Sequence, residues 1–229
     1  MAITPTTLTR GAAIAAVVAG LLFVGIQIGH PHLDAGSITS TEVQVRGSLK
    51  FLMAVLSLVG ITGMYLSQVR KNGVLGLIGY LVLAAAYLLI TCMTYLAAFV
   101  LPQLATTNAA YVDDAIDVVV GRATTGDVGL FAMAVQVQNI SFLAGGLIFG
   151  IALFRARVLA RWATALLAVG GVVTILLSVL PDAFYRLLAF PNGIAMVGLG
   201  VSLWLTARTV NTTQQTDVDS PRLTGASAE

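Results

Sequence analysis

The sequence predicts an all-α membrane protein, a six-transmembrane-helix bundle with N- and C-termini cytoplasmic. Hydrophobic residues make up 58% of the 229 positions and charged residues only 10%. A soluble domain carries charges at about a quarter of its positions, so most of this surface must face lipid. Six apolar runs divide the chain, and each is close to the length of about 20 residues that crosses a bilayer as a helix.

The charges of the links between these runs alternate. The links after the second and fourth runs contain only basic charges: Arg70, Lys71, Arg155, Arg157 and Arg161. The other links hold every acidic residue outside the C-terminal tail: Asp34, Glu42, Asp113, Asp114, Asp117, Asp127 and Asp182. Arg and Lys are retained on the cytoplasmic side of a membrane. The pattern therefore predicts a multi-pass protein of the cell (inner) membrane.

The first three predicted spans cover residues 11–29, 51–69 and 74–101. The first apolar run exceeds the roughly 7–15 residues of a signal peptide, which favours an uncleaved span. Pro102 closes the third span, because proline lacks the N–H that a helix interior needs. The link 70–73 is so short that spans two and three must form an antiparallel hairpin.

The remaining predicted spans cover residues 128–154, 159–180 and 184–207, and Pro181 closes the fifth. The sixth span has two interpretations. It either begins near Ala183 and is kinked at Pro191, or it begins at Pro191, where proline is tolerated in the first turn. Arg186 favours the second version, with residues 182–190 as an interfacial helix. Residues 1–210 form one membrane domain, and the polar tail 211–229 is predicted to be disordered.

One hairpin carries a resemblance. The stretch Phe154-Arg155-Ala156-Arg157-Val158-Leu159-Ala160-Arg161-Trp162, followed by a Gly-rich span, resembles hairpins of uncharacterised bacterial multi-span inner-membrane proteins. The resemblance covers only this part of the chain. It implies a bacterial inner membrane and no particular activity.

The fourth span contains a belt of polar side chains near its middle: Gln136, Gln138, Asn139 and Ser141. Amide groups at this depth need partners, because lipid offers no water. Thr91, Thr94 and Tyr95 of the third span are the expected facing partners. The belt has two interpretations, either hydrogen bonding between helices or the polar wall of a ligand-binding pocket.

The third link predicts an amphipathic outer-surface helix over residues 109–121, capped by Asn108. Its apolar face is Val112, Ala115, Ile116, Val119 and Val120, and Asp113, Asp114 and Asp117 fall on the opposite face. The simplest interpretation is a solvated acidic face. The string Asp-Asp-Ala-Ile-Asp also resembles the Asp-rich motif of prenyl-diphosphate enzymes, which implies Mg²⁺ held against a diphosphate. No second copy of the motif occurs.

The first link brings together His30, His32, Asp34 and Glu42. Imidazole and carboxylate groups could bind a transition metal or relay protons. The alternative is an interfacial turn ordered by hydrogen bonds. No metal site is predicted with these residues alone.

The remaining features of the sequence concern helix packing, disulfide formation and nucleic-acid binding. Gly146 and Gly150 form a GxxxG element, which permits close helix approach either within the chain or in a homo-oligomer. Cys92 has no second cysteine with which to form an intrachain disulfide. There is no basic stripe with interleaved aromatic residues, so no nucleic-acid partner is expected.

Three functional hypotheses follow. The first is an accessory or small-ligand/lipid-binding protein, whose outer vestibule is built from the first and third links above the polar belt. The second is a membrane enzyme acting on a lipid or isoprenoid substrate (terpene-cyclase or prenyl-diphosphate type). It would use Mg²⁺ on the three aspartates, with His30, His32 and Glu42 as acid–base groups. The third is a small transporter or channel subunit, although no ionisable residue lies near the middle of a span.

Overall fold

The computed structural model describes residues 4–29, 33–177 and 189–219, and no strand occurs in these ranges. Its elements are, in order, α1 (Pro5–Gly25), η1 (Ser37–Thr39), α2 (Thr41–Leu66), α3 (Val69–Tyr95), η2 (Leu96–Val100), α4 (Leu101–Ala105), α5 (Ala109–Val120), α6 (Leu130–Ala156), α7 (Arg161–Leu177) and α9 (Ala189–Asp219). The all-α prediction is confirmed for this part of the chain.

Five of the described helical stretches are long and apolar enough to cross a membrane: Pro5–Gly25, Thr41–Leu66, Val69–Ala105, Leu130–Ala156 and Ala189–Arg208. The third of them joins α3, η2 and α4, and the fifth is the first part of α9. In α7 the stretch Arg161–Val172 is also apolar but shorter, and it lies at the position of the fifth predicted span. The apolar helices therefore support a multi-pass membrane protein.

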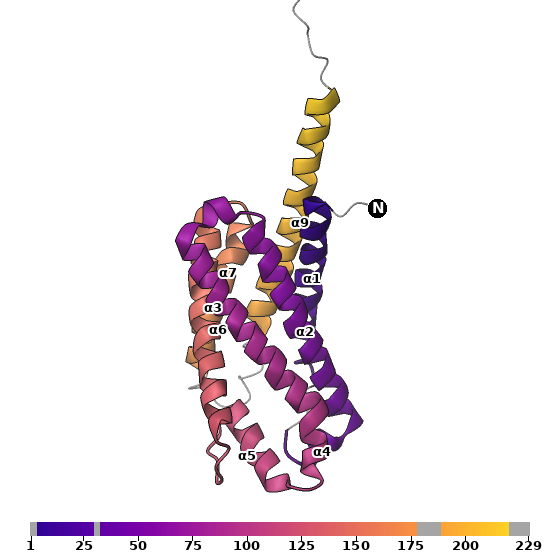
Figure 1. Cartoon of the computed structure of the whole chain (residues 1–229), viewed down its shortest axis with the longest axis vertical. Coiled ribbons are helices and arrows are strands. Elements are labelled where there is room, and N and C mark those ends of the chain that lie inside the picture. The colour runs from indigo at the N-terminus through magenta and orange to yellow at the C-terminus, as the bar shows by residue number, and fades with distance from the viewer. Residues whose placement is uncertain (1–3, 30–32, 178–188, 220–229) are drawn as a thin grey trace, which may run out of the picture.

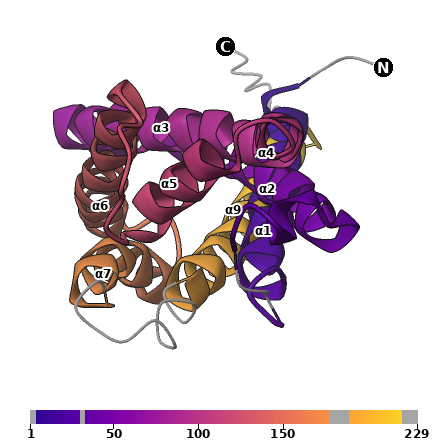
Figure 2. The same ribbon diagram turned by 90° about the horizontal axis from the view of Figure 1, so that it is seen from below.

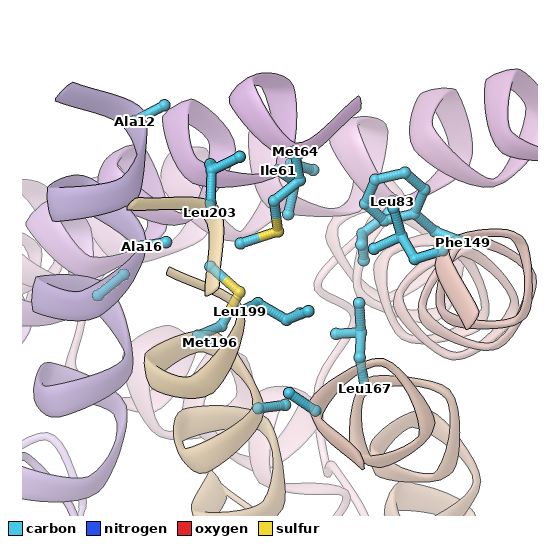
Figure 3. Packing of buried hydrophobic residues seen from close by; sticks show 14 of the residues in the cluster. Ala12, Ala16, Ile61, Met64, Leu83, Phe149, Leu167, Met196, Leu199 and Leu203 are labelled. Carbon is cyan, nitrogen blue, oxygen red and sulfur yellow. The ribbon is translucent and has the colours of Figure 1, made fainter. Parts of the chain in front are cut away.

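The long helices form a ring. Viewed along the bundle in Figure 2, the order around the ring is α1, α2, α3, α6, α7 and α9, and contacts between α7 and α9 and between α9 and α1 close it. The start of α1, the α2–α3 turn, the α6–α7 turn and the end of α9 lie at one end (Figure 1), while α4 and α5 lie at the other. Figure 3 shows the large side chains that fill the centre, among them Ile61, Met64, Leu83, Phe149, Leu167, Met196, Leu199 and Leu203.

The first two helices begin earlier than predicted. The Thr4 hydroxyl accepts from the N–H of Thr7 at 3.2 Å, and this cap starts α1 at Pro5. The Ser40 hydroxyl caps α2 at Thr41, ten residues before the predicted span two (residues 51–69). The prediction placed each helix start at the beginning of an apolar run and so left out these polar first turns. A helix begins at its capping residue, which need not be hydrophobic.

The third span also differs from its prediction. A helical turn at Val69 precedes a break at Gly73, whose φ of 57° is easy only for glycine. At the other end, Pro102 does not close the span. The chain passes through one π-helical stretch, and Pro102 lies in the first turn of α4. Proline is tolerated there because the N–H groups of a first helical turn have no partner within the helix.

Helix α9 continues to Asp219, so residues 211–219 are helical where disorder was expected. No glycine or proline interrupts the chain between Gly200 and Pro221. The described helix begins at Ala189, which places Pro191 in its first turn. The predicted features at Pro181, Asp182 and Arg186 lie outside the described residues.

Glycines set the closest helix contacts. A Cβ on Gly79 of α3 would lie 2.5 Å from the Phe149 nitrogen, and a Cβ on Gly145 of α6 would lie 2.6 Å from the Leu83 Cα. The two GxxxG glycines are buried, and a Cβ on Gly150 would lie 2.6 Å from the Ala168 nitrogen of α7. This face therefore packs within the chain, which was the first of the two alternatives that the GxxxG element left open.

Candidate ligand-binding site

Helix α5 caps one end of the bundle. Its N-terminus is capped by Asn108, whose Oδ1 accepts from the Tyr111 N–H at 3.2 Å, and it ends at Gly121 with a φ of 77°. The buried side chains of Val112 and Ile116 join a small apolar cluster with the first link and α2, formed by Ala35, Ile38 and Val43. The predicted amphipathic helix is thus present, and its apolar face is turned toward the bundle.

Two of the α5 carboxylates tie this helix to its neighbours. Asp113 accepts from the backbone N–H of Ala35 at 2.6 Å. Asp117 pairs with Arg122 at 2.6 Å, and the same guanidinium donates to the Leu33 carbonyl at 3.3 Å. The first and third links are therefore joined through these side chains.

The third carboxylate holds the loop that follows α5. Asp114 is 8% exposed and accepts from the Thr125 N–H at 2.8 Å and from the Thr125 hydroxyl at 3.2 Å. Backbone N–H groups of Gly126 and Thr125 hold the pKa of Asp114 below its ordinary value, because they stabilise the charged form. The interpretation of a simply solvated acidic face is therefore wrong for Asp114.

Of the other candidate acid–base residues, Glu42 and Asp34 make contacts of their own within the described part of the chain. Glu42 pairs with Arg46 at 3.1 Å on the exposed side of α2, and His30 and His32 lie outside the described residues. Asp34 accepts from the Ser37 N–H at 2.6 Å within its own turn. Across the described ranges, no three His, Cys, Asp or Glu side chains form a group that could hold a metal ion.

Arg46 joins the ends of two helices. Its Nη1 donates to the carbonyls of Ile26 at 2.9 Å and Ile28 at 3.0 Å, just after the last turn of α1. The C-terminus of a helix carries unsatisfied carbonyls and partial negative charge, which a guanidinium satisfies. Arg46 thereby fixes the C-terminal end of α1 to α2.

A cavity of about 160 Å³ lies beneath α5. Its lining combines the first link with α2, α3, η2, α4, α5 and α6. The apolar part consists of Leu33, Ile38, Val43, Gly47, Ile90, Met93, Ala97, Leu101, Ala115, Ile116, Val119, Val120 and Phe131. Four polar side chains complete it: Arg46, Lys50, Thr94 and Gln138.

Three of these polar residues lie at similar depth. Lys50 lies nine residues after the start of α2 and Gln138 eight residues after the start of α6, while Thr94 lies eleven residues before the end of α4, which continues α3 through η2. At 1.5 Å per residue these separations are roughly 12–17 Å. They come from α2, α3 and α6. The cavity therefore has an apolar roof from α5 and a polar layer contributed by three different spans.

The rest of the predicted polar belt lies elsewhere. Gln136 and Asn139 are exposed on α6, Ser141 is half-buried, and Gln138 donates to Asn139 at 3.3 Å. Tyr95 is 48% exposed and contacts the rings of Phe51 and Phe99, so it does not line the cavity.

The threonines of α3 satisfy their hydroxyls within their own helix. Thr91 donates to the Tyr87 carbonyl at 2.7 Å and Thr94 to the Ile90 carbonyl at 2.7 Å. Each hydroxyl oxygen keeps acceptor capacity beyond this bond. Thr94 can thus still accept a hydrogen bond from a molecule in the cavity.

The cationic part of this site was not predicted. Arg46 and Lys50 fall in the link between the first two predicted spans and were not among the predicted site residues. Their i, i+4 spacing would place both on one helix face, but the predicted span two began after them. Recognising Ser40 as a helix cap would have revealed that both belong to the same transmembrane helix.

Comparison of the chain with protein-family models, with curated proteins and with solved structures found no match.

Proposed function

We propose that the chain crosses the cell membrane six times, with both termini in the cytoplasm and α5 on the outer side. The α2–α3 and α6–α7 turns, which carry basic residues, lie at the same end of the bundle as the start of α1 and the end of α9 (Figure 1), which fits the retention of basic residues inside. Helix α7, with its 17 residues, is close to the lower limit for a crossing and supplies the sixth span.

Its function, in this proposal, is to bind a small amphipathic ligand or one end of a lipid chain in the cavity beneath α5. The observation that carries this is the composition of the cavity wall. Apolar side chains surround it, while Arg46, Lys50, Thr94 and Gln138 supply a few polar groups. Binding sites for small molecules combine a mostly apolar lining with few polar groups that fix orientation.

The size of the cavity restricts the ligand. An apolar cavity of about 150 Å³ holds a molecule the size of benzene, and this one measures about 160 Å³. It accommodates a short hydrocarbon body or the end of a longer chain, and not a whole lipid.

The charge of the wall indicates which ligands fit. Both charged residues of the lining, Arg46 and Lys50, are cations. Attraction between opposite charges is stronger where water is excluded. A ligand that carries a carboxylate or phosphate at one end of a hydrocarbon group therefore matches the site.

The acidic face of α5 gives no comparable support to the enzyme hypothesis. Asp113, Asp114 and Asp117 each bind a separate backbone or guanidinium partner in the cap. Their carboxylates bind and hold neighbouring segments of the chain. The ligand-binding hypothesis is therefore better supported than the enzyme hypothesis.

Thermal unfolding of the purified protein in detergent tests the proposal, with hexanoate, hexylamine and hexanol as probes of equal chain length. A ligand that binds only the folded state raises its stability by RT ln(1 + [L]/Kd). Hexanoate is expected to raise the unfolding temperature more than the other two. An equal response to hexanoate and hexylamine would contradict a cationic site.

Two variants and a control locate the effect. Lys50→Gln removes a cation from the wall, and Ala115→Phe fills the cavity from the α5 roof; both should abolish the response to hexanoate. Lys71→Gln removes a cation from the opposite end of the bundle and should leave the response unchanged.

A further inference from the structure

We propose a second site, at the opposite end of the bundle: a binding site for an anionic phospholipid, with its phosphate between Arg10 and Arg208 and an acyl chain in the groove between α1 and α9. This site shares no residue with the cavity beneath α5. It requires the membrane crossing of α1 and α9, and not the ligand-binding function proposed above.

Two guanidiniums share one indole ring here. The guanidinium carbon of Arg10 lies 5.5 Å from the centre of the Trp204 ring, and that of Arg208 lies 5.4 Å from it. Arg10 is on the second turn of α1, and Trp204 and Arg208 are on α9. Cation–π contact with one ring therefore places the two guanidinium carbons no more than about 11 Å apart, near the start of α1.

The charge of Arg10 is not balanced by a carboxylate within the described residues, where the ion pairs are Arg46–Glu42 and Arg122–Asp117. Its Nε is buried without a hydrogen-bond partner. Burying a polar group without a partner is costly. An anion with several acceptor oxygens, such as a phosphate, would satisfy Nε and balance the charge of Arg10.

An apolar groove of about 700 Å³ leads away from these arginines. It is lined by Gly20, Leu21, Val24, Gly25, Ala160, Trp162, Ile194, Val197, Gly198, Val201, Ser202 and Leu205. The Trp162 ring packs over Gly198, and this contact forms one side of the groove. The wall is apolar and exposed, with Leu21 at 60% and Leu205 at 55%.

The groove and the arginines lie on the same face of the helix pair. Helical spacing puts Arg208 in line with Val201 and Leu205 on α9, and Arg10 in line with Leu21 on α1. From Leu205 to Ile194 the groove extends about 16 Å, at 1.5 Å per residue. This matches one leaflet, half of a hydrocarbon core roughly 30 Å thick. A lipid whose headgroup meets Arg208 can therefore place an acyl chain along the groove.

The proposed headgroup is that of an anionic phospholipid of the inner leaflet. Basic residues just cytoplasmic of a transmembrane helix attract anionic headgroups. A zwitterionic headgroup brings its own cation close to the two guanidiniums and so fits less well. The site should therefore discriminate between lipids by charge.

Quenching of Trp204 fluorescence by brominated lipid measures this preference. The full chain carrying Trp162→Phe, so that Trp204 is the sole tryptophan, is reconstituted in phosphatidylcholine vesicles. These contain the same fraction of brominated phosphatidylglycerol or brominated phosphatidylcholine. We expect stronger quenching by the anionic lipid, with each arginine contributing about fivefold to relative affinity. Equal quenching by both lipids would overturn the proposal.

Variants distinguish specific binding of the headgroup by Arg10 and Arg208 from a general attraction between basic residues and anionic lipid. Arg10→Gln combined with Arg208→Gln should remove the preference, and the paired lysine substitutions should retain most of it. Lys71→Gln combined with Arg155→Gln removes the same net charge elsewhere at this end and should leave the preference intact. If this second pair abolishes it equally, the attraction is a general surface effect and the site is refuted.

The groove has its own test. Val201→Phe adds bulk in the groove and should weaken quenching by the anionic lipid, whereas Val169→Phe, at a similarly exposed position on α7, should not. Addition of inorganic phosphate should leave the quenching unchanged. Displacement by phosphate, or equal effects of the two phenylalanines, would show that no acyl chain occupies the groove.

Native mass spectrometry of the unsubstituted chain gives a measurement that does not depend on Trp162→Phe. It should retain phosphatidylglycerol over phosphatidylcholine, and the paired Arg10→Gln and Arg208→Gln variant should lose this selectivity. Retention of both lipids to the same extent by the unsubstituted chain would refute the site.

Discussion

Replacement of Gly145 by alanine tests whether backbone contact between α3 and α6 holds the ring together. A Cβ at this position would lie 2.6 Å from the Cα of Leu83 and 2.8 Å from its Cβ. Contacts of this length do not occur in relaxed structures, so the two helices must move apart. Since the obstacle is largely backbone, no side-chain rotation can remove it.

The expected magnitude follows from two opposing terms. Alanine is favoured over glycine inside a helix by about 0.5–1 kcal/mol. Overpacking a close contact costs about 1–3 kcal/mol, and a backbone obstacle places this case in the upper half of that range. Gly145→Ala should therefore lower the free energy of unfolding by about 1–2.5 kcal/mol.

Gly79→Ala should behave similarly, because its Cβ would lie 2.5 Å from the Phe149 nitrogen in the same contact. One separation of α3 from α6 relieves both clashes. The double variant should thus lose less than the sum of the single losses, as expected for coupled positions.

The measurement is reversible unfolding in mixed micelles, followed by circular dichroism as the denaturing detergent is increased. Gly11→Ala is the matched control, since no atom lies within 4 Å of the added Cβ. It should leave stability unchanged or raise it by up to about 1 kcal/mol. If Gly145→Ala is as stable as Gly11→Ala, the inferred backbone contact does not exist.

Three further predictions concern the cap and the topology. Acidification below about pH 4 should loosen the α5 cap. The pKa of Asp114 is held below its ordinary 3.8, so its stabilisation is complete above that pH and is lost as the pH falls through the lowered value; amide hydrogen exchange should show this loss, and Asp114→Asn should remove the pH dependence. Arg46→Gln should destabilise the protein by about 1–2 kcal/mol in the same detergent titration, because two carbonyls at the end of α1 lose a charged donor; an unchanged midpoint would contradict this role. In a Cys92→Ser background, single cysteines at Lys71 and Thr124 should react with a membrane-impermeant maleimide from opposite sides of the membrane, and labelling from one side would contradict the proposed topology.

Local patterns determined the amphipathic α5 and its cap. Val112 and Ile116 follow helical spacing and are buried, and Asn108 caps the helix as expected. Both features depend on residues within a few positions of each other. The sequence was therefore sufficient to predict them.

The ends of the spans were harder to predict, since hydrophobicity marks the lipid-facing part of a helix and not its capped ends. Ser40 starts α2 well outside the apolar run, and Pro102 is passed without ending the helical stretch. Residues near these ends, among them Arg46 and Lys50, were consequently placed in a link although they belong to a helix.

Composition and charge order by themselves determined that this chain is a helical membrane protein, because the cost of exposing polar backbone to lipid leaves few alternatives. They could not determine which polar residues meet. Gln138 and Thr94 line one cavity while Gln136 faces outward, and Asp113 of α5 binds the backbone N–H of Ala35 in the distant first link. Those pairings depend on how the helices are rotated and packed against each other, which is decided only when the whole ring is assembled.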